Sequence, residues 1–476
     1  MNTTNSMKKN IVPAYIGAAV SIAAAVPVWF MDPVLGLDGD GMHMLAVFCL
    51  CLLLWIFHPI PAEMTALLLM ILPTALGIVS WKVSFSGWTS STTWFLFGGL
   101  VIGRLVSVSG LDKRFTLNLL RRFGGNRMSV WKVTVTIMII ACLCALIIPS
   151  GTVLALILAA QIFPLVELYG LDRKSNVAKI FMLTVPIVVL LCGNHSLSGS
   201  SHNLILLGSL EDAGYSVTWL GWLLALLPDT IFVCVILLLS YKLTLKPEKK
   251  ELENGKATIE AQLNELGKMS KDEVKATVLF CAALVLWITN FLTNIHVATV
   301  ALAVAFIAVL PGVGVLNFRE TMQKLNWPII IFVAAVLGFP AMMDAVHIDT
   351  AFTLVFEYLR GVFHGTWGFL VLVWLISQLT AWLGLSIGAP LLFMPFLFPI
   401  AEALGFPAVY AALLQGYMQP TVLYYHAPAP LVVASYGAYT QTDYAKYQMV
   451  VILAKIVFTP VLFFLWWPFL SSIGLL

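Results

Sequence analysis

Small and polar residues interrupt the hydrophobic sequence at a few places, and these places hold most of the side chains that could do chemistry. The runs are PSGT at 149–152, GNHSLSGSSHN at 193–203, GLSIGAP at 384–390 and HAPAP at 426–430. Proline removes a backbone donor and glycine loosens the backbone, so a helix is expected to part at such a run. Freed N–H groups at a half-helix N-terminus favour an anion, and freed carbonyl groups favour a small cation.

The first run predicts an anion site. Ser150, Gly151 and Thr152 would offer two hydroxyls and backbone N–H groups to a bound anion. The alternative is a kinked helix whose hydroxyls bond back to a carbonyl of the preceding turn. The run at 384–390 offers Ser386 and, at Gly388, mainly backbone groups, and substrate contact is expected there as well.

The run at 193–203 suits either kind of ion. Asparagine and serine oxygens and released carbonyls could coordinate a small hard cation, while the donors could meet an anion. A histidine could carry a proton, since its unperturbed pKa is about 6.5; the alternative is a structural hydrogen bond. The candidates are Asn194, His195, Gly199, His202 and His426 for cation or proton coupling, and Ser200 and Ser201 for substrate.

Two charged residues occupy comparable places in the Trp-containing apolar segments 91–112 and 325–349. Arg104 and Asp344 are functional candidates for that reason alone. Arg104 lies six residues before Gly110, about 9 Å at helical rise. Its side chain could therefore simply extend to the membrane surface.

The composition places the chain in a lipid bilayer. Hydrophobic residues make up 60% of its 476 positions and charged residues 10%, against about 45–50% and about 25% in soluble domains. This length has room for about 11 transmembrane helices with their connections. The net charge of +3 is too small to suggest nucleic acid. All seven cysteines lie in apolar stretches, where they are expected to be buried and unpaired.

The charged loops predict the orientation. Residues 111–132 carry six Lys and Arg residues and are expected in the cytoplasm, whereas 32–41 carry three Asp and no basic residue and suit the outside. The basic start MNTTNSMKKN is interpreted as the cytoplasmic flank of a retained first span rather than a signal peptide. Residues 133–169 have basic loops on both sides, which predicts a re-entrant hairpin, since an ordinary crossing would join opposite sides.

The pattern recurs in the second half. STTWFLFGGLVIGRLVSVSGLD at 91–112 and LNWPIIIFVAAVLGFPAMMDAVHID at 325–349 each contain a Trp, an apolar run, a Gly-containing middle and a final apolar-Asp step. Each is followed by a broken hydrophobic stretch and then by a span interrupted by small residues. Counting crossings, the first unit runs inward and the second outward, so the halves are inverted. Matching interruptions in inverted halves point to a transporter binding site.

The predicted fold class is an all-α polytopic membrane protein, an inverted-repeat transporter with two re-entrant hairpins and a cytoplasmic N-terminus. The only long charged stretch is expected to be a cytoplasmic linker between the halves, partly helical. The predicted parts are a first half at 1–245 with a hairpin at 133–169 and a broken helix at 178–209, the linker at 246–274, and a second half at 275–476 with a hairpin at 366–404 and a broken helix at 406–440.

Enzymes fit the sequence poorly. The chain has neither the H-E-x-x-H nor the G-x-S-x-G motif, and it has no phosphate-binding P-loop, which argues against ATP-driven transport. An anion channel is the stronger rival to a carrier. A channel would need a continuous polar path, whereas most of the expected spans are uniformly apolar.

The whole chain resembles the divalent anion/sodium symporter family, part of a wider ion-transporter superfamily. WFLFGGLVIGRLVSVSGLDKR at 94–114 is similar to that family's fourth-helix signature. GSSHNLILLGSLEDAGYSVTWLGWLLALLP at 199–228 resembles the stretch that includes and follows its Gly-Thr-Pro-Pro-Asn motif. The resemblance implies a homodimer, with scaffold spans at 12–110 and a transport domain that moves as an elevator. It also implies uptake or exchange of dicarboxylates, tricarboxylates or sulfate, commonly with sodium.

The family's Ser-Asn-Thr triplets, which bind substrate carboxylates and sodium, are altered here. The first becomes Ser150, Gly151 and Thr152, and any sodium ion would lie near Ser150 and Gly199. Each lost asparagine removes a carbonyl ligand for a cation and an amide donor for a carboxylate. Ion symport and anion exchange therefore both remain open.

The second-half motifs are altered further. No Ser-Asn-Thr triplet occurs there, so the resemblance assigns its place to Ser386-Ile387-Gly388 or to the next three residues. The second-half version of Gly-Thr-Pro-Pro-Asn becomes residues 427–431, which adds Pro428 and Ala429 to the substrate candidates.

The expected function is secondary active transport of a small organic anion, of di- or tricarboxylate type, across a bacterial inner (plasma) membrane. The alternatives are an anion channel, or a carrier for a non-carboxylate anion such as sulfate or a sulfonate. Apart from sodium, no cofactor is expected. The expected partners are the anion, the lipid bilayer and a second copy of the chain.

Overall fold

The computed structural model describes residues 3–34, 36–124, 127–146, 148, 150–251, 255–348, 358, 361–382, 389–418, 422–423 and 427–476. Within these residues the protein is all-helical and contains no β-strand. The prediction of an all-α membrane protein is thus confirmed. The number of crossings and the re-entrant course of the hairpins remain predictions.

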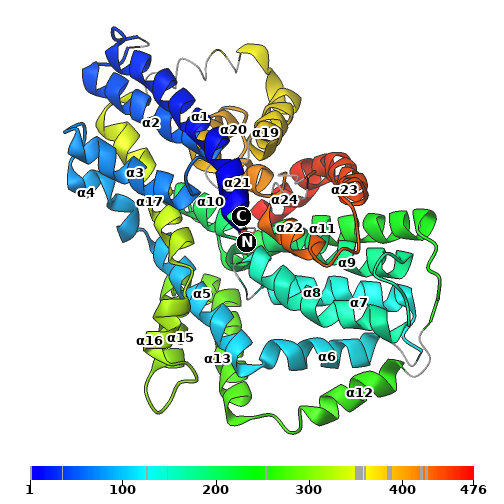
Figure 1. Cartoon of the computed structure of the whole chain (residues 1–476). Helices are drawn as coiled ribbons and strands as arrows, with labels where there is room; N and C mark the ends of the chain where they lie inside the picture. The colour runs from blue at the N-terminus through cyan, green and yellow to red at the C-terminus, as the bar shows by residue number, and fades with distance from the viewer. Residues whose placement is uncertain are drawn as a thin grey trace. The chain divides into compact units, whose positions relative to one another are not determined.

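The first half of the chain forms eleven α-helices and two short 3₁₀ helices among the described residues (Figure 1). They are α1 (Thr3–Phe30), α2 (Gly39–Phe57), α3 (Ala62–Ala75), α4 (Trp81–Ser84), η1 (Ser86–Thr89), α5 (Ser91–Ser109), α6 (Leu111–Phe123), α7 (Val130–Ala145), α8 (Gly151–Leu168), α9 (Asn176–His195), η2 (Leu197–Gly199), α10 (Ser201–Asp212) and α11 (Trp219–Thr244).

The remaining helices begin in the predicted linker. They are α12 (Gly255–Glu265), α13 (Lys271–Ile288), α14 (Asn290–Thr293), α15 (Val297–Val309), α16 (Phe318–Lys324), α17 (Trp327–Ala345), α19 (Gly365–Trp382), α20 (Ala389–Ala403), α21 (Ala408–Tyr417), α22 (Pro428–Ala434), α23 (Gln441–Val461), the π-helical η4 (Leu462–Trp466) and α24 (Trp467–Ser472).

Seven helical segments in the described part of the chain are long and apolar enough to cross a membrane. They are α2, α5, α8, α9, α11, α17 and the continuous stretch Gln441–Ser472. Shorter apolar helices, including α3, α7 and α15, accompany them. Length and composition thus support a chain that crosses the bilayer several times.

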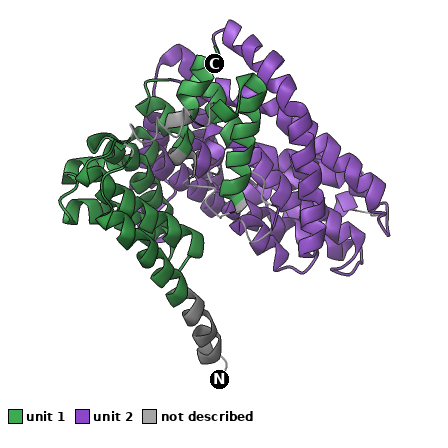
Figure 2. Ribbon diagram, turned by 90° about the horizontal axis from the view of Figure 1, so that it is seen from above, with its two compact units in different colours: residues 1–93, 205–215, 326–415 green, residues 94–204, 216–325, 416–476 purple. Residues whose placement is uncertain are grey.

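The helices form two compact units, each built from separate parts of the sequence (Figure 2). Unit 1 contains residues 1–93, 205–215 and 326–415. Unit 2 contains residues 94–204, 216–325 and 416–476. Each unit therefore takes residues from both predicted halves, and a polar run from one half can lie near a polar run from the other.

Helix α9 is the centre of unit 2. In its apolar window 83% of the residues are buried, and α7, α8, α11 and α22 all pack against it. Its side chains are almost uniformly apolar, as expected for a helix that is surrounded by other helices. The helix is thus a fixed core element that positions whatever follows its C-terminal end.

Close helix contacts in each unit depend on glycine. In unit 2, a Cβ atom on Gly98 of α5 would lie 2.7 Å from the carbonyl carbon of Ala301 in α15. In unit 1, a Cβ on Gly87 of η1 would lie 1.9 Å from the carbonyl oxygen of Ala334 in α17. Small residues let membrane helices approach to backbone contact.

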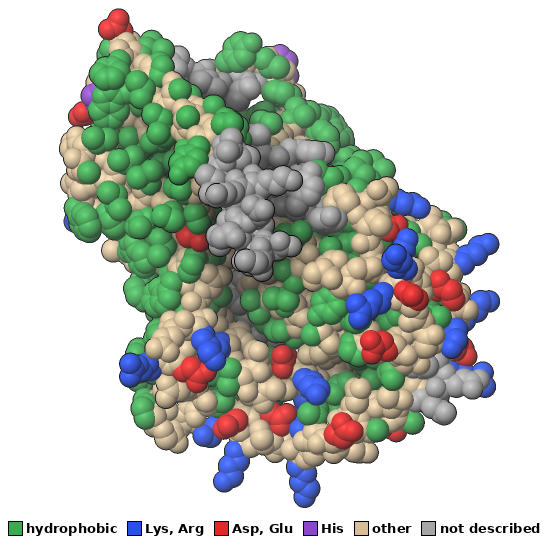
Figure 3. Space-filling view, viewed as in Figure 1, with side chains coloured by type: hydrophobic (Ala, Val, Ile, Leu, Met, Phe, Trp, Pro, Cys, Tyr) green, Lys and Arg blue, Asp and Glu red, His purple; other side chains and the backbone are tan. Residues whose placement is uncertain are grey.

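The basic segment 111–132, expected as a cytoplasmic loop, contains the amphipathic helix α6. Leu117 and Leu120 face inward, and α12 of the linker packs on α6 through Ile259 and Leu263. The linker is therefore docked on unit 2 along these apolar side chains. Lys and Arg side chains gather over the edge of unit 2 that carries α6 and α12 (Figure 3).

An ion pair fastens α6 to the start of α13. Arg114 Nε donates to Glu273 Oε1 at 2.6 Å, and its other nitrogens reach the carbonyl oxygens of Leu266, Gly267 and Lys268. The Arg114 hydrogen bonds lower the pKa of Glu273. Both side chains are largely buried, at 12% and 8% exposure.

The cysteines correct one expectation. Cys142 of α7 and Cys192 of α9 form a disulfide, although all seven cysteines were expected to be unpaired. Cys51 and Cys144 are buried as expected, but Cys281 is exposed. Sequence alone did not reveal the pairing, because the two residues are 50 positions apart and each lies in a featureless apolar run.

Candidate functional site

The helix parts at the first polar run. Helix α7 ends at Ala145 and α8 begins at Gly151, with Ser150 as its N-cap. The Ser150 hydroxyl accepts a hydrogen bond from the N–H of Val153 at 3.4 Å. Ser150 thus caps the start of α8. The run places the N-terminus of α8, with its partial positive charge, at the tip of the α7–α8 pair.

The second polar run also divides a helix. Helix α9 ends at His195, η2 covers Leu197–Gly199, and α10 begins at Ser201. The side-chain amide of Asn203 donates to the carbonyl oxygens of Gly193 at 2.8 Å, Asn194 at 3.2 Å and Ser196 at 2.7 Å. The break is therefore held in shape by its own asparagine, whose amide caps the carbonyl end of α9.

These two breaks meet in unit 2. The Ser198 hydroxyl donates to the carbonyl oxygen of Leu146, just after α7, at 2.7 Å. A Cβ on Gly199 would lie 2.7 Å from the carbonyl oxygens of both Ala145 and Gly193. Only glycine allows this approach, so the α9–α10 break lies directly against the C-terminal end of α7.

Two indole groups of α11 complete this arrangement. Trp219 Nε1 donates to Ser198 Oγ at 3.3 Å, and Trp222 Nε1 donates to the carbonyl oxygen of Asn194 at 3.0 Å. Both rings are fully buried. The sequence interpretation did not include them. In the sequence they are visible only as two Trp residues three positions apart at the start of an apolar segment.

Burial divides the predicted site residues of unit 2 into two groups. Residues of the half-buried group are accessible to a solute, whereas residues of the buried group pack inside the break. Half-buried are Ser150, Gly151, Thr152, Asn194, Ser200 and Ser201, and buried are His195, Gly199 and His202.

The predicted second-half residues are only partly described. Helix α22, which begins with Pro428 and Ala429, packs on α8 and on α9. Ala429 is buried and Pro428 is exposed. Unit 2 therefore contains the segment between α7 and α8, the break between α9 and α10, and the start of α22. The candidates Ser386, Ile387, Gly388 and His426 lie outside the described residues.

The histidines have structural surroundings. His195 is 1% exposed and hydrogen-bonds the backbone of Cys142, so it links the end of α9 to α7. The N–H of His202 donates to the Ser200 hydroxyl at 3.2 Å, which makes Ser200 a cap for the start of α10. A proton-carrying role for either residue stays a prediction.

Arg104 lies in an ion pair at the end of α5. Its guanidinium group contacts Glu320 of α16 at 3.0 Å, and Glu320 also pairs with Lys324 at 2.8 Å. Glu320 and Lys324 are both exposed. This favours the simpler reading, in which the Arg104 side chain extends to the membrane surface.

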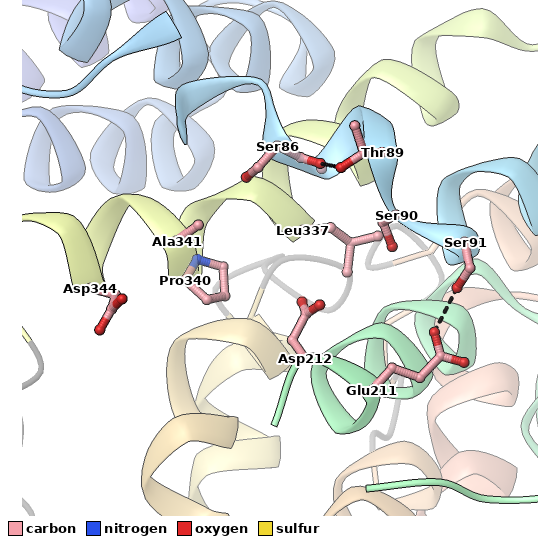
Figure 4. A pocket seen from close by; sticks show the side chains of 11 residues that line it. Ser86, Thr89, Ser90, Ser91, Glu211, Asp212, Leu337, Pro340, Ala341 and Asp344 are labelled. Atoms are coloured by element: carbon pink, nitrogen blue, oxygen red, sulfur yellow. Dashed lines mark hydrogen bonds between the residues drawn. The ribbon is translucent and has the colours of Figure 1, made fainter. Parts of the chain in front are cut away.

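A cavity of about 660 Å³ in unit 1 is acidic (Figure 4). Asp344 lies on one side of it and Glu211 and Asp212 on the other, and Glu211 accepts a 2.6 Å hydrogen bond from Ser91. Burial and the neighbouring Glu211 raise the pKa of Asp212 to about 6. An anion would be repelled by this carboxylate lining, so the cavity does not suit the expected substrate.

Two buried ionisable residues on neighbouring helices were not anticipated. Asp229 of α11 and Lys455 of α23 are both buried in unit 2, at 2% and 9% exposure. Their sequence signal was visible, because each is an ionisable residue inside an otherwise apolar segment. No group of three or more His, Cys, Asp or Glu side chains suited to a metal ion occurs in the part of the chain that the structure covers.

Known proteins are similar to this chain over more than half of its length. Residues 14–473 match the family described as "Sodium:sulfate symporter transmembrane region". A "Membrane protein" of Cupriavidus necator is 25% identical over 66% of this chain and 64% of its own length. "Inner membrane protein YbhI" of Escherichia coli is 25% identical over 61% of both chains. "Sodium-dependent high-affinity dicarboxylate transporter 3" of Caenorhabditis elegans is 25% identical over 53% of this chain and 47% of its own.

The aligned part of this chain spans less than two thirds of each of these three relatives. The family match is more extensive, since it begins within α1 and ends three residues before the last position. It agrees with the apolar, all-helical fold and with the resemblance seen in the motifs. The chain is a multi-pass membrane protein and belongs to the sodium:sulfate symporter transmembrane region family.

Proposed function

We propose that this chain is a secondary carrier for small organic dianions. One carboxylate of the substrate is held at the N-terminus of α8 by the hydroxyls of Ser150 and Thr152 and by backbone N–H groups. The observation that supports the proposal is the hydrogen bond from Ser198 to Leu146, because Leu146 is the C-cap of α7 and lies four residues before Ser150, the N-cap of α8. A family of anion symporters and a relative named as a dicarboxylate transporter support the same reading.

The second carboxylate is assigned to the start of α10. Ser200 caps this helix, and Ser200 and Ser201 are half-buried, as is Ser150 across the contact. Two helix N-termini that meet at one place suit an anion with two separated charges better than a single compact one. Pro428 and Ala429 at the start of α22, with Ser386, Ile387 and Gly388, complete the proposed substrate contacts.

Anion exchange is the coupling mode that the first break favours. A sodium ion near Ser150 and Gly199 would need carbonyl oxygens, but those of Gly193 and Asn194 already accept hydrogen bonds from Asn203 and Trp222. An oxygen with a bound donor has less charge to offer a cation. Sodium symport, known from the name of one relative, is the second mode.

The proposal includes movement and assembly. The binding breaks cross the membrane as one body, in an elevator movement, and two copies of the chain form the carrier. These features follow from the resemblance to the divalent anion/sodium symporters. A channel would not need them, because its path stays open to both sides.

Uptake into liposomes tests the proposed function. The purified chain is reconstituted, and uptake of labelled succinate, malate, citrate and sulfate is measured with and without an inward sodium gradient. Each anion is also tested with the same unlabelled anion inside. Saturable uptake of a C4 dicarboxylate that increases at least about tenfold with internal anion supports an exchanger. Accumulation that needs the sodium gradient supports symport.

Two results would contradict the proposal. Uptake of sulfate but of no carboxylate would reassign the carrier to a compact inorganic anion. Uptake that does not saturate and ignores internal anion would indicate a channel. Ser150→Ala/Thr152→Ala protein is the matched control, since it should fold but lose most of the dicarboxylate uptake.

A further inference from the structure

A buried ionisable pair in unit 2 lies on helices that are otherwise apolar. Asp229 belongs to α11 and Lys455 to α23, and these two helices pack against each other. Both lie in segments long and apolar enough to cross a membrane. A charge in such a place is costly, so it is retained where a partner or a function requires it.

Lys455 occupies the end of a half-helix. Its ammonium nitrogen donates to the main-chain oxygen of Tyr417 at 2.5 Å. It also lies 5.2 Å from the centroid of the Tyr417 ring. Tyr417 is the last residue of α21, where carbonyl groups lack helical partners and the helix dipole is negative. In carriers with broken helices, such an end is where a transported cation binds.

Asp229 supplies the opposite charge. Asp229 is 2% exposed on α11, which packs against the helix of Lys455, and the hydroxyl of Tyr417 hydrogen-bonds Thr459. Asp229 Oδ1 has no hydrogen-bond partner among the described residues. A carboxylate, a carbonyl and two hydroxyls are hard oxygen donors of the kind that bind hard cations. The Lys455 ammonium is bound to the carbonyl oxygen of this group.

The two half-helix ends in unit 2 are satisfied differently. At the end of α9, the carbonyl groups accept from neutral donors, the amide of Asn203 and the indole of Trp222. At the end of α21, the donor is the charged side chain of Lys455. With Asp229 the site is neutral overall, and adding a sodium ion would leave an uncompensated buried charge.

We propose that Lys455 is the resident cation of the second broken helix, with Asp229 as its countercharge, so that the end of α21 takes no sodium ion. This inference rests on the proposed function for its consequence alone. A site that a side chain fills cannot couple transport to a sodium gradient. Sodium coupling could then occur only at the break between α9 and α10.

Sodium-dependent thermal unfolding tests the site without any substrate. Purified protein is compared in NaCl and in choline chloride for the wild type, Lys455→Ala, and Asp229→Asn/Lys455→Ala. Removing the ammonium exposes the oxygen donors and the carboxylate. Sodium should then raise the unfolding temperature of Lys455→Ala by at least about 3 °C more than that of the wild type, at a concentration near one hundred times its Kd. The double variant should return to the wild-type response.

Further variants keep the test decisive. Lys455→Gln retains a donor for Tyr417 but no charge, and should show the same extra sodium response if Lys455→Ala cannot be purified. Lys455→Arg and Lys446→Ala, the latter on the exposed face of α23, should respond like the wild type. An equal sodium shift in all variants would overturn the inference.

Transport provides a second readout. Sodium should stimulate the uptake of labelled succinate by Lys455→Ala at least about fivefold more than it stimulates uptake by the wild type. The double variant Asp229→Asn/Lys455→Ala should lose this extra stimulation. If the wild type transports no carboxylate, the proposed function fails, while the unfolding measurement still decides whether Lys455 holds a cation site. If the wild type transports succinate but Lys455→Ala shows no extra sodium activation, the inference is contradicted.

Discussion

The Ser198 hydroxyl donates a 2.7 Å hydrogen bond to the carbonyl oxygen of Leu146. This bond joins the break after α9 to the tip of the α7–α8 pair, two regions that are 52 positions apart in the sequence. It also receives support from Trp219, whose indole donates to the same hydroxyl. The bond thus couples the two halves of the proposed substrate site.

Ser198→Ala should loosen this contact while leaving the fold intact. The variant leaves the Leu146 carbonyl and the Trp219 indole without their partner, at a cost of about 1–3 kcal/mol. We expect a lower unfolding temperature and a several-fold higher KM for the dianion. Thr136→Ala, whose hydroxyl bonds only within α7, is the control and should change the KM little. An unchanged KM in Ser198→Ala would contradict the coupling.

Ser150→Ala and Thr152→Ala should each weaken substrate binding. A hydrogen bond to a charged group contributes about 1.5–3 kcal/mol, so each KM should rise roughly 10- to 100-fold. The unfolding temperature should fall less for Thr152→Ala, because Ser150 also caps α8. Substrate-induced protection in the unfolding assay measures binding directly. Equal protection in both variants and the wild type would remove these residues from the site.

Gly199→Ala should distort the break. The added Cβ would meet two backbone oxygens at 2.7 Å, which cannot move aside as a side chain would. Overpacking of this kind costs about 1–3 kcal/mol. Gly39→Ala, at a helix start with open space around it, is the matched control. We expect reduced maximal uptake and a lower unfolding temperature for Gly199→Ala alone, and wild-type values would show that the approach is looser than described.

The Arg114–Glu273 pair should stabilise the protein in a pH-dependent way. The pKa of Glu273 is lowered from 4.5 by its hydrogen bonds with Arg114. Its contribution is therefore complete above about pH 4.5 and is lost as the pH falls through the lowered folded value. Glu273→Gln should unfold at a lower temperature than the wild type at pH 7, and the gap should narrow at more acidic pH. A gap that is constant with pH would contradict this.

Local chemistry made the breaks predictable from the sequence. Ser150 and Gly151 mark a helix start, and the run around Gly199 marks a helix end, because proline, glycine and serine act on the backbone within one turn. The contacts across the breaks were not predictable. Ser198 is one serine among several, and nothing in its neighbourhood specifies Leu146 as its partner.

Other misses had a visible signal. Asp229 and Lys455 are charges in apolar segments, which is a signal visible in the sequence. The segment 111–132 was read by its charge alone, although Leu117 and Leu120 lie at helical spacing and α6 buries both. Pairing of distant residues, such as Cys142 with Cys192, depends on how helices pack, which no single segment encodes.

The most direct test of the central claim is counterflow of a C4 dicarboxylate. Liposomes containing the protein and loaded with unlabelled succinate are diluted into a trace of labelled succinate, with no sodium on either side. A carrier should accumulate the label transiently above equilibrium, and Ser150→Ala/Thr152→Ala should abolish this overshoot. A channel, or a protein that does not move dicarboxylates, would give label that only equilibrates or does not enter, and either result would contradict the account.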